Sequence, residues 1–385
     1  MNRYLEVSIR KDLQKKMVLL AGPRQVGKSI LSRNLERNLK NGATVDEEAF
    51  QERTVVGDRI WPQRAELLIL IQLQKVPDWV SWLKGVIDGR SKTIGMNDRM
   101  LVTGSARMEA FRQAGKSWVG RYYLWRLHPI SVREWCETSN ATPEQALMHL
   151  MERSGFPAPV LALSHEEAEH WRSEHFSYVM HEDVIEASGL HEEKAMRSFV
   201  QILRERVGTP LSLAAIAHEV GVAPSTITRY LGILESQYFV FTVRPWSKDI
   251  ARATLHQPKV YFFDVGLVLG DASAQFENFV AYHLLKNVHW QQDAKGQNVD
   301  LHYIRTKDDA QVDFSLSDAT GAEPKLTHLI ECKLSDAKPH GALKRFSHEH
   351  PDAVAVQLVR DLEEEQKIGS LHIRHAAKWL AELEV

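Results

Sequence analysis

The stretch that most constrains this chain is a glycine-rich turn between an apolar run and a segment with helical spacing. It has the pattern G-x-x-x-x-G-K-S, and its residues are Gly22, Pro23, Arg24, Gln25, Val26, Gly27, Lys28 and Ser29. The apolar run 17–20 before it predicts a buried strand, and the spacing of apolar residues in 30–35 predicts a helix. Strand, glycine-rich turn and helix are the context of a phosphate-binding P-loop. The sequence therefore predicts a nucleotide site in a parallel α/β sheet.

Each part of this P-loop has a predicted role toward phosphate. Gly22 and Gly27 allow the backbone to turn several N–H groups toward an anion, and the helix N-terminus adds partial positive charge. We expect Lys28 to reach the β- and γ-phosphates and the Ser29 hydroxyl to bind Mg²⁺. The cofactors implied are therefore ATP and Mg²⁺.

Composition sets outer limits on the remaining functions. The 385 residues suffice for two or three domains, and the net charge of −2 restricts any DNA contact to a local patch. Cys136 and Cys332 lie far apart and outside any C-x-x-C pattern, which is typical of a reducing compartment rather than of a disulfide framework or zinc site. The polar N-terminus and the lack of any run near 18 apolar residues predict a cytoplasmic protein without a membrane partner.

The apolar run 67–71 is typical of a parallel strand that is buried on both faces. In P-loop ATPases such a strand ends in an Asp that holds Mg²⁺ and a Glu that activates water. Here Ile71 and Gln72 occupy these positions; Ile71 cannot coordinate a metal, and Gln72 can orient a water but cannot take up its proton. The acids Asp78 and Asp88 lie beyond the strand and could substitute only if the chain folded back. We therefore expect nucleotide binding with slow or absent turnover.

Two further segments of the first domain supply candidate phosphate contacts. Thr103 or Ser105, at the end of a predicted strand 100–105, would sense the γ-phosphate or its water, although an ordinary strand-to-turn transition explains them equally well. Arg121 and Arg126, in a strand-like segment, would stabilise phosphate charge in their own subunit or in a neighbour's. Surface arginines on a strand are the alternative.

The middle of the chain contains a helix-turn-helix pattern at about 211–232. One helix is predicted to end at Gly221 and the next to begin near Pro224, and the alternation in 239–244 predicts a strand that completes a winged-helix outline. The positions that would face a DNA groove are Ser225, Thr226, Thr228 and Arg229. Because Arg229 is the only base among them, DNA contact and a structural or protein-contact role both stay open.

The last part of the chain predicts a hairpin of strands 301–305 and 311–316, followed by a third strand 327–333. Glu331 and Lys333 are two residues apart, so their side chains leave the same face of that strand. An Asp with Glu-x-Lys on the next strand is the arrangement of PD-(D/E)XK nucleases, in which Asp313 and Glu331 would bind Mg²⁺ and Lys333 would orient or activate water. Glu277, on a predicted helix 276–285, would complete the metal site. Alternating charge on an exposed strand is the alternative explanation of Glu-x-Lys alone.

Several segments in addition to the P-loop carry a family resemblance. They are 76–79 (VPDW), 83–85 (LKG), 102–107 (VTGSAR), 120–129, 154–157 (SGFP) and the acidic residues of the C-terminal strands. Together they closely resemble a large prokaryotic family of AAA-type P-loop ATPases fused to a C-terminal nuclease-like domain of unknown function.

The resemblance implies roles for particular residues. Lys28 and Ser29 would bind ATP–Mg²⁺, Ser105 or its neighbours would sense it, and Arg121 would act in trans, which needs a homo-oligomer. Family members generally end the strand 67–70 with Asp-Glu, so Ile71-Gln72 is a departure that weakens the expectation of hydrolysis. The resemblance also implies a restriction-endonuclease-like fold and matches four residues of that site: Glu277, Asp313, Glu331 and Lys333.

We therefore predict an α/β protein with three parts. These are a P-loop domain at 1–140, a helical and winged-helix segment at 141–245 and a nuclease-like domain at 246–385. The predicted function is ATP binding as a conformational switch with impaired hydrolysis. One alternative is a Mg²⁺-dependent nuclease that the ATPase-like domain regulates, and the other is a non-enzymatic assembly module.

Overall fold

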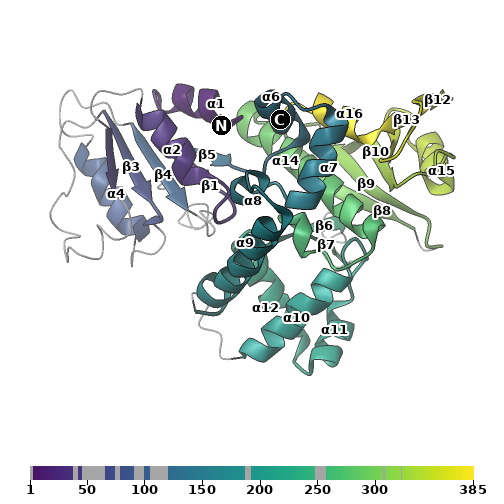
Figure 1. The fold of residues 1–385 in the computed structure, drawn as a ribbon, viewed down its shortest axis with the longest axis horizontal. Helices are drawn as coiled ribbons and strands as arrows, with labels where there is room; N and C mark the ends of the chain where they lie inside the picture. Colours follow the sequence, from purple (N-terminus) through teal and green to yellow (C-terminus); the bar gives the residue numbers. More distant parts are fainter. Residues whose placement is uncertain are drawn as a thin grey trace. The chain divides into compact units, whose positions relative to one another are not determined.

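The computed structural model of the protein describes residues 3–37, 42–45, 66–73, 79–90, 99–104, 120–186, 192–247, 257–306, 308–321 and 323–385. The chain divides into two compact units, Met1–His128 and Pro129–Val385. The first unit contains a five-stranded sheet and the second an eight-stranded sheet, so the protein is a mixed α/β protein, as predicted (Figure 1).

The N-terminal unit is built on a parallel sheet with the strand order β2-β3-β4-β1-β5. Its strands are β1 Met17–Ala21, β2 Gly42–Val45, β3 Leu67–Ile71, β4 Met100–Gly104 and β5 Tyr122–Arg126. Its helices are α1 Glu6–Asp12, α2 Lys28–Arg37 and α4 Trp79–Arg90. Every residue of β1 and of β4 is buried, as expected of central parallel strands that are covered on both faces. The predicted strands of this unit are thus confirmed.

The C-terminal unit begins with a helical segment. Its elements are α6 Val132–Ser139, α7 Pro143–Arg153, α8 Pro157–Val160, α9 His165–Tyr178, the π-helix η3 Val179–Glu186, α10 Glu193–Glu205, α11 Leu213–Val220 and α12 Pro224–Ser236. The helix pair predicted at 211–232 is present as α11 and α12. Its turn follows from the sequence because Gly221 ends α11 with a φ of 78°, a left-handed conformation that suits glycine, and Pro224 fits the first position of α12.

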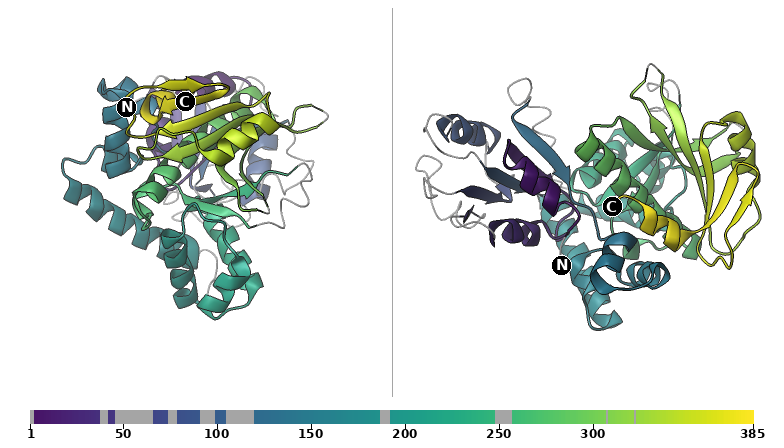
Figure 2. Two further views of the ribbon diagram at one scale, coloured as in Figure 1. Left: turned by 90° about the vertical axis from the view of Figure 1, so that its right-hand side faces the viewer. Right: turned by 90° about the horizontal axis from the view of Figure 1, so that it is seen from above.

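The second sheet has the order β12-β13-β11-β10-β9-β8-β6-β7. Figure 2 shows the ribbon from two further sides. Its strands are β6 Val240–Pro245, β7 Lys259–Phe262, β8 Val299–Arg305, β9 Gln311–Asp318, β10 Lys325–Lys333, β11 Val354–Val359, β12 Gln366–Ile368 and β13 Leu371–His375. The accompanying helices are η4 Val265–Leu267, α14 Ala272–Lys295, α15 Gly341–Glu349 and α16 Ala376–Glu382. Helix α14 packs against β7, β8 and β10, whereas α15 packs against β9, β10 and β11.

Two features of this unit differ from the predicted division at 140 and 245. Strand β6, expected to complete a winged helix, pairs with β7 and with β8, so its backbone groups are satisfied within the C-terminal sheet. Segment 129–134 is fastened to α14: the buried Lys286 ammonium contacts Glu134 and donates to the Ser131 hydroxyl at 3.0 Å, and His283 Nε2 accepts from the Val132 N–H at 3.0 Å. These contacts place the unit boundary at 128/129.

Helices in the described part of the chain include none that is both long enough and apolar enough to cross a membrane.

Candidate nucleotide-binding site and carboxylate–lysine cluster

The P-loop connects the carboxyl end of β1 to α2, which begins at Lys28. Gly22 has a φ of 145° and Gly27 a φ of 104°, which are conformations that side chains rarely adopt. A Cβ atom on Gly22 would lie 2.2 Å from the carbonyl oxygen of Leu127. Glycine is therefore required at position 22 both for the turn and for its close approach to the chain that leaves β5.

The Lys28 side chain is folded over the turn that it follows. Its ammonium donates to the carbonyl oxygens of Gly22 at 2.8 Å and of Pro23 at 2.6 Å, and only 8% of the residue is exposed. Ser29, in the first turn of α2, is half-buried. A phosphate that took over these hydrogen bonds would strengthen them, because charged acceptors bind an ammonium group more tightly than neutral carbonyls do. The arrangement is suited to an anionic ligand.

Arg3, for which the sequence predicts no role, forms a hydrogen bond to the backbone of the P-loop. Its guanidinium is buried and donates to the carbonyl oxygens of Val26 at 2.7 Å and of His128 at 2.5 Å. The adjacent Tyr4 hydroxyl donates to the Arg126 carbonyl at 2.8 Å. Helix α1 begins at Glu6, and this leaves Arg3 and Tyr4 available for these contacts. An arginine near the N-terminus offers no sequence signal for such a role.

Ile71 and Gln72 lie at the carboxyl edge of the sheet, where the acidic pair was expected. Ile71 is the last residue of β3 and pairs with Thr103 of β4, which lies next to β1. The Gln72 N–H donates to the Thr103 carbonyl at 3.0 Å, and Gln72 has a φ of 57°. The departure from Asp-Glu is therefore at the edge from which the P-loop extends.

Other predicted residues of this site fall elsewhere. Ser105 and Asp78 lie outside the described residues, and so does the side chain of Asp88 on α4. The two arginines lie at opposite ends of β5. Arg126, its last residue, pairs with Ala21 at the carboxyl end of β1, whereas Arg121 directly precedes its first residue, Tyr122, which pairs with Met17 at the amino end of β1. Five residues of strand span about 16 Å, so Arg121 is remote from the P-loop of its own chain. The role of Arg121 in a neighbouring subunit stays a prediction.

The four residues predicted for the nuclease-like site do come together in the C-terminal unit. The Lys333 ammonium lies 2.7 Å from Glu331 Oε1, and the Asp313 N–H donates to Glu331 Oε2 at 3.3 Å. Glu277, on α14, joins this group through a residue that the sequence analysis missed. That residue is Lys259 of β7, whose ammonium lies 2.9 Å from Glu277 Oε1 and 3.6 Å from Asp313 Oδ1. We refer to Lys259, Glu277, Asp313, Glu331 and Lys333 as the carboxylate–lysine cluster.

Burial and mutual repulsion perturb the acids of this cluster. Burial, together with the Asp313 charge, raises the pKa of Glu277 to about 7 and that of Glu331 to about 8. Burial opposes charge on the Lys259 ammonium, but Glu277 and Asp313 outweigh it and raise the Lys259 pKa. The raised pKa values thus favour the charged form of Lys259 and the protonated forms of Glu277 and Glu331.

The cluster does not have the arrangement of a metal site. Within the described ranges, no group of three or more His, Cys, Asp and Glu side chains is placed so that it could hold a metal ion. Lys259 occupies the space between two of the expected ligands, Glu277 and Asp313. A sequence signal for it exists, because Lys259 heads the otherwise apolar run 259–263 and a lysine in a buried strand requires a partner.

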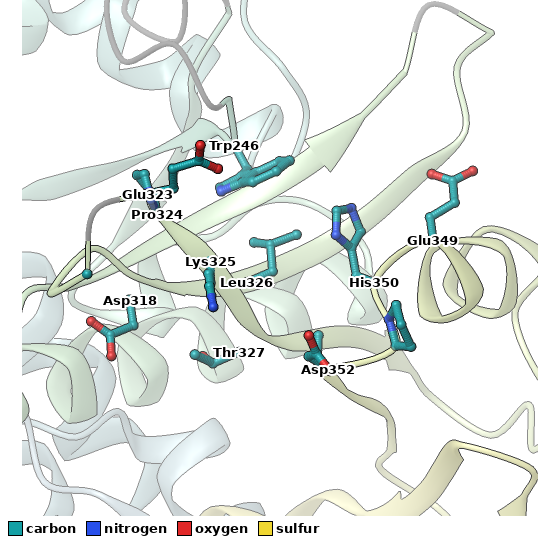
Figure 3. A pocket seen from close by; sticks show the side chains of 13 residues that line it. Trp246, Asp318, Glu323, Pro324, Lys325, Leu326, Thr327, Glu349, His350 and Asp352 are labelled. Atoms are coloured by element: carbon teal, nitrogen blue, oxygen red, sulfur yellow. The ribbon is translucent and has the colours of Figure 1, made fainter.

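A separate cavity of about 890 Å³ lies between Trp246, the carboxyl end of β9, the start of β10 and the end of α15 (Figure 3). Four acidic residues line it: Asp318, Glu323, Glu349 and Asp352. It adjoins the ends of β9 and β10 that are remote from Asp313 and Glu331. Because these acids outnumber Lys325 and His350 in the lining, the cavity is poorly suited to phosphate.

Two protein-family models match parts of this chain. Residues 14–136 match the family described as AAA domain, and residues 144–274 match a domain of unknown function, DUF8612. Two uncharacterised proteins, from Mycobacterium tuberculosis and Mycobacterium bovis, are each 28% identical over 314 residues, which are 77% of this chain and 67% of the relative.

Solved structures give distant similarities. The ORC1 protein of Aeropyrum pernix, in complex with DNA, has a TM-score of 0.37 and 15% identity, covering 73% of this chain and 94% of that one. A Walker-type ATPase of Pyrococcus abyssi has a TM-score of 0.39 and 14% identity, covering 69% and 94%. The sequence match at 14–136 includes the P-loop, so the N-terminal part of this chain matches an AAA-type P-loop ATPase domain.

Proposed function

We propose that this protein binds ATP at the P-loop and uses the nucleotide as a conformational switch, with impaired hydrolysis. The observation that carries the proposal is the difference between the P-loop after β1 and the end of β3, at the same edge of the sheet. The P-loop after β1 has its lysine, its glycines and the start of α2 in place, whereas β3 ends in Ile71 and Gln72. Binding groups are therefore present where the hydrolytic groups are replaced.

The chemistry of each group supports slow turnover. Lys28 and the N–H groups at the start of α2 would hold the phosphates, and Ser29 would supply a hydroxyl to Mg²⁺. Gln72 could align a water molecule through its amide, but no proton could pass to it. A nucleotide that binds and is cleaved slowly is suited to holding one conformation for a long time.

The test measures binding and turnover separately. A fluorescent ATP analogue with Mg²⁺ should bind the native chain and lose at least 100-fold in affinity in Lys28→Ala, while Lys295→Ala, at an exposed lysine, binds like the native chain. Native ATPase activity should be low and should rise at least tenfold in the double variant Ile71→Asp, Gln72→Glu. A native rate that equals that of the double variant and vanishes in Lys28→Ala would refute the impairment.

The same measurements separate the alternatives. An assembly module needs no nucleotide, so saturable ATP binding excludes its pure form. A nuclease would show Mg²⁺-dependent cutting that disappears in Asp313→Ala and survives Lys28→Ala; the lysine between Glu277 and Asp313 does not favour it.

The helix pair α11–α12 is as well suited to contact with a protein as to contact with DNA. Ser225, Thr228 and Arg229 are exposed on α12, but nearby Arg206 is paired with Glu219 at 2.8 Å. The Arg206 charge is thus already balanced by a carboxylate, which weakens its attraction for phosphate groups.

A further inference from the structure

Lys259 is a fully buried lysine whose surroundings are built for a permanent cation. Its ammonium lies 2.9 Å from Glu277 Oε1 and 3.6 Å from Asp313 Oδ1. It also lies 5.4 Å from the ring centre of Tyr303 and 6.0 Å from that of Phe314. A buried charge is tolerated only when it is paired, and aromatic faces add to the attraction. Strand β7 therefore places a cation between the carboxylates of Glu277 and Asp313.

The carboxylate oxygens that a metal ion would need already have donors from the protein. Glu277 Oε1 accepts from Lys259 and from the Tyr261 hydroxyl at 2.6 Å. Asp313 Oδ2 accepts from the Cys332 N–H at 3.0 Å. Glu331 Oε1 lies 2.7 Å from the Lys333 ammonium and 3.2 Å from His340 Nδ1, and its other oxygen accepts from the Asp313 N–H. Each of the three acids thus has at least one carboxylate oxygen engaged by a donor or cation of the protein.

The segment that leads into the helix pair covers the same acids. Gly208, with a φ of 76°, lies so close that a Cβ atom on it would be 2.9 Å from the Glu277 carboxylate. The Leu211 N–H donates to the Pro258 carbonyl at 2.9 Å, which aligns residues 208–211 with the start of β7. Only 16% of the Glu277 side chain is exposed. A ligand that approaches Glu277 must therefore displace protein backbone as well as Lys259.

We propose that the Lys259 ammonium is the resident cation of the carboxylate–lysine cluster and takes the place that a divalent metal holds in a PD-(D/E)XK centre. The cluster is then a metal-independent ion-pair network that joins α14, β7, β9 and β10. Two lysines face three carboxylates in it, and shared protons balance the remaining charge. A divalent cation is excluded as long as Lys259 stays, because its charge would be repelled by the ammonium and its ligands are engaged. This inference concerns the C-terminal unit and does not depend on nucleotide binding.

The experiment measures Mn²⁺ binding to the full chain without nucleotide, by calorimetric titration with MnCl₂. Native protein and Asp313→Asn should bind Mn²⁺ equally weakly. Lys259→Met should gain a site at least tenfold tighter than any in the native chain, and adding Asp313→Asn to Lys259→Met should remove it. Lys295→Met, at an exposed lysine paired with Glu384, is the matched control and should gain nothing.

Removal of Lys259 also removes the partner of two buried acids, so Lys259→Met is expected to fold better with MnCl₂ than without it. A rise in its melting temperature with MnCl₂ that the native chain does not show would support the proposal. If Lys259→Met does not fold at all, the comparison of native protein with Asp313→Asn decides. The proposal is overturned if the native chain binds Mn²⁺ at least tenfold more tightly than Asp313→Asn, or if folded Lys259→Met binds it no more tightly than the native chain.

Discussion

Two buried lysines, Lys28 and Lys259, mark the two chemical centres of this protein, and their acceptors differ. Lys28 donates to the main-chain carbonyl oxygens of a glycine-rich turn, at the start of a helix. Lys259 lies between the side-chain carboxylates of Glu277 and Asp313, within a sheet and its covering helix. A carbonyl acceptor can be exchanged for a phosphate with a gain in strength, whereas a carboxylate acceptor already supplies the opposite charge.

The backbone follows the same division. The N-terminal centre has Gln25 and Gln72 in left-handed conformations beside Gly22 and Gly27. Such strained positions gather at sites where ligands bind and release. The residues of the carboxylate–lysine cluster lie in regular strands and a helix, whose backbone groups form regular hydrogen bonds. The comparison indicates that one centre is prepared for a ligand and the other is complete in itself.

The largest expected effect tests whether buried lysine–carboxylate pairs in the C-terminal unit are structural. Lys286 and Glu134 form a second such pair, and both are nearly inaccessible. Lys286→Met would leave the Glu134 charge buried without its ammonium, so we expect a loss of about 3–5 kcal/mol in the free energy of unfolding. Chemical denaturation of the full chain, with amide exchange in α14 to identify the melting unit, measures it.

The control for Lys286→Met is Lys295→Met, which removes an exposed pair with Glu384 and should cost less than about 1 kcal/mol. Equal losses in the two variants would mean that burial does not distinguish these lysines, and the contrast between the two centres would fail.

A second prediction uses the pH dependence of the carboxylate–lysine cluster. Burial, then the Asp313 charge, raises the pKa of Glu331 from its ordinary 4.5 to about 8, against the opposing effect of Lys333. The folded state therefore holds a proton that the unfolded state releases between about pH 4.5 and pH 8. The contribution of Glu331 is fully present below pH 4.5 and is lost as the pH rises through 8, so the stability of this unit should fall over that interval.

The variant that isolates this effect is Glu331→Gln, which keeps the shape and removes the titration. Its melting temperature should vary less between pH 5 and pH 8 than that of the native chain. The other charged or titratable groups that contact Glu331 are Asp313, Lys333 and His340, and they are unchanged in both proteins. Parallel pH profiles of the two proteins would show that Glu331 does not carry the effect.

The sequence predicted the elements of both centres better than their contacts. Apolar runs and the P-loop pattern predicted β1, β3, β4 and β5 of the first sheet, and Asp313, Glu331 and Lys333 of the predicted nuclease-like site lie together. Arg3 and Lys259 were missed because their roles depend on which distant backbone or acid lies beside them. Local spacing cannot supply that information. Local spacing likewise does not show that residues 129–140 belong to the C-terminal unit, where the buried contacts of Lys286 join residues more than 150 positions apart.

The smallest predicted effect concerns strain at Gln72. Its φ of 57° is a left-handed conformation that costs an ordinary residue roughly 1 kcal/mol or more, whereas glycine adopts it freely. Gln72→Gly should therefore raise the free energy of unfolding by about 0.5 kcal/mol, since part of the gain is offset by the greater chain entropy of unfolded glycine. Lys15→Gly, at an exposed position of the same unit that has no such conformation, should lower it.

Amide exchange in β3 and β4 of the full chain measures both glycine variants. Stabilisation by Gln72→Gly together with weaker ATP binding would show that the strain at this edge is kept for the ligand. If Gln72→Gly is destabilising like Lys15→Gly, then the greater chain entropy of unfolded glycine outweighs the relief of strain, because the backbone hydrogen bond from residue 72 to Thr103 is kept in the variant. In that case the N-terminal centre would store little strain, and its difference from the carboxylate–lysine cluster would lie in the acceptors of Lys28 and Lys259 alone.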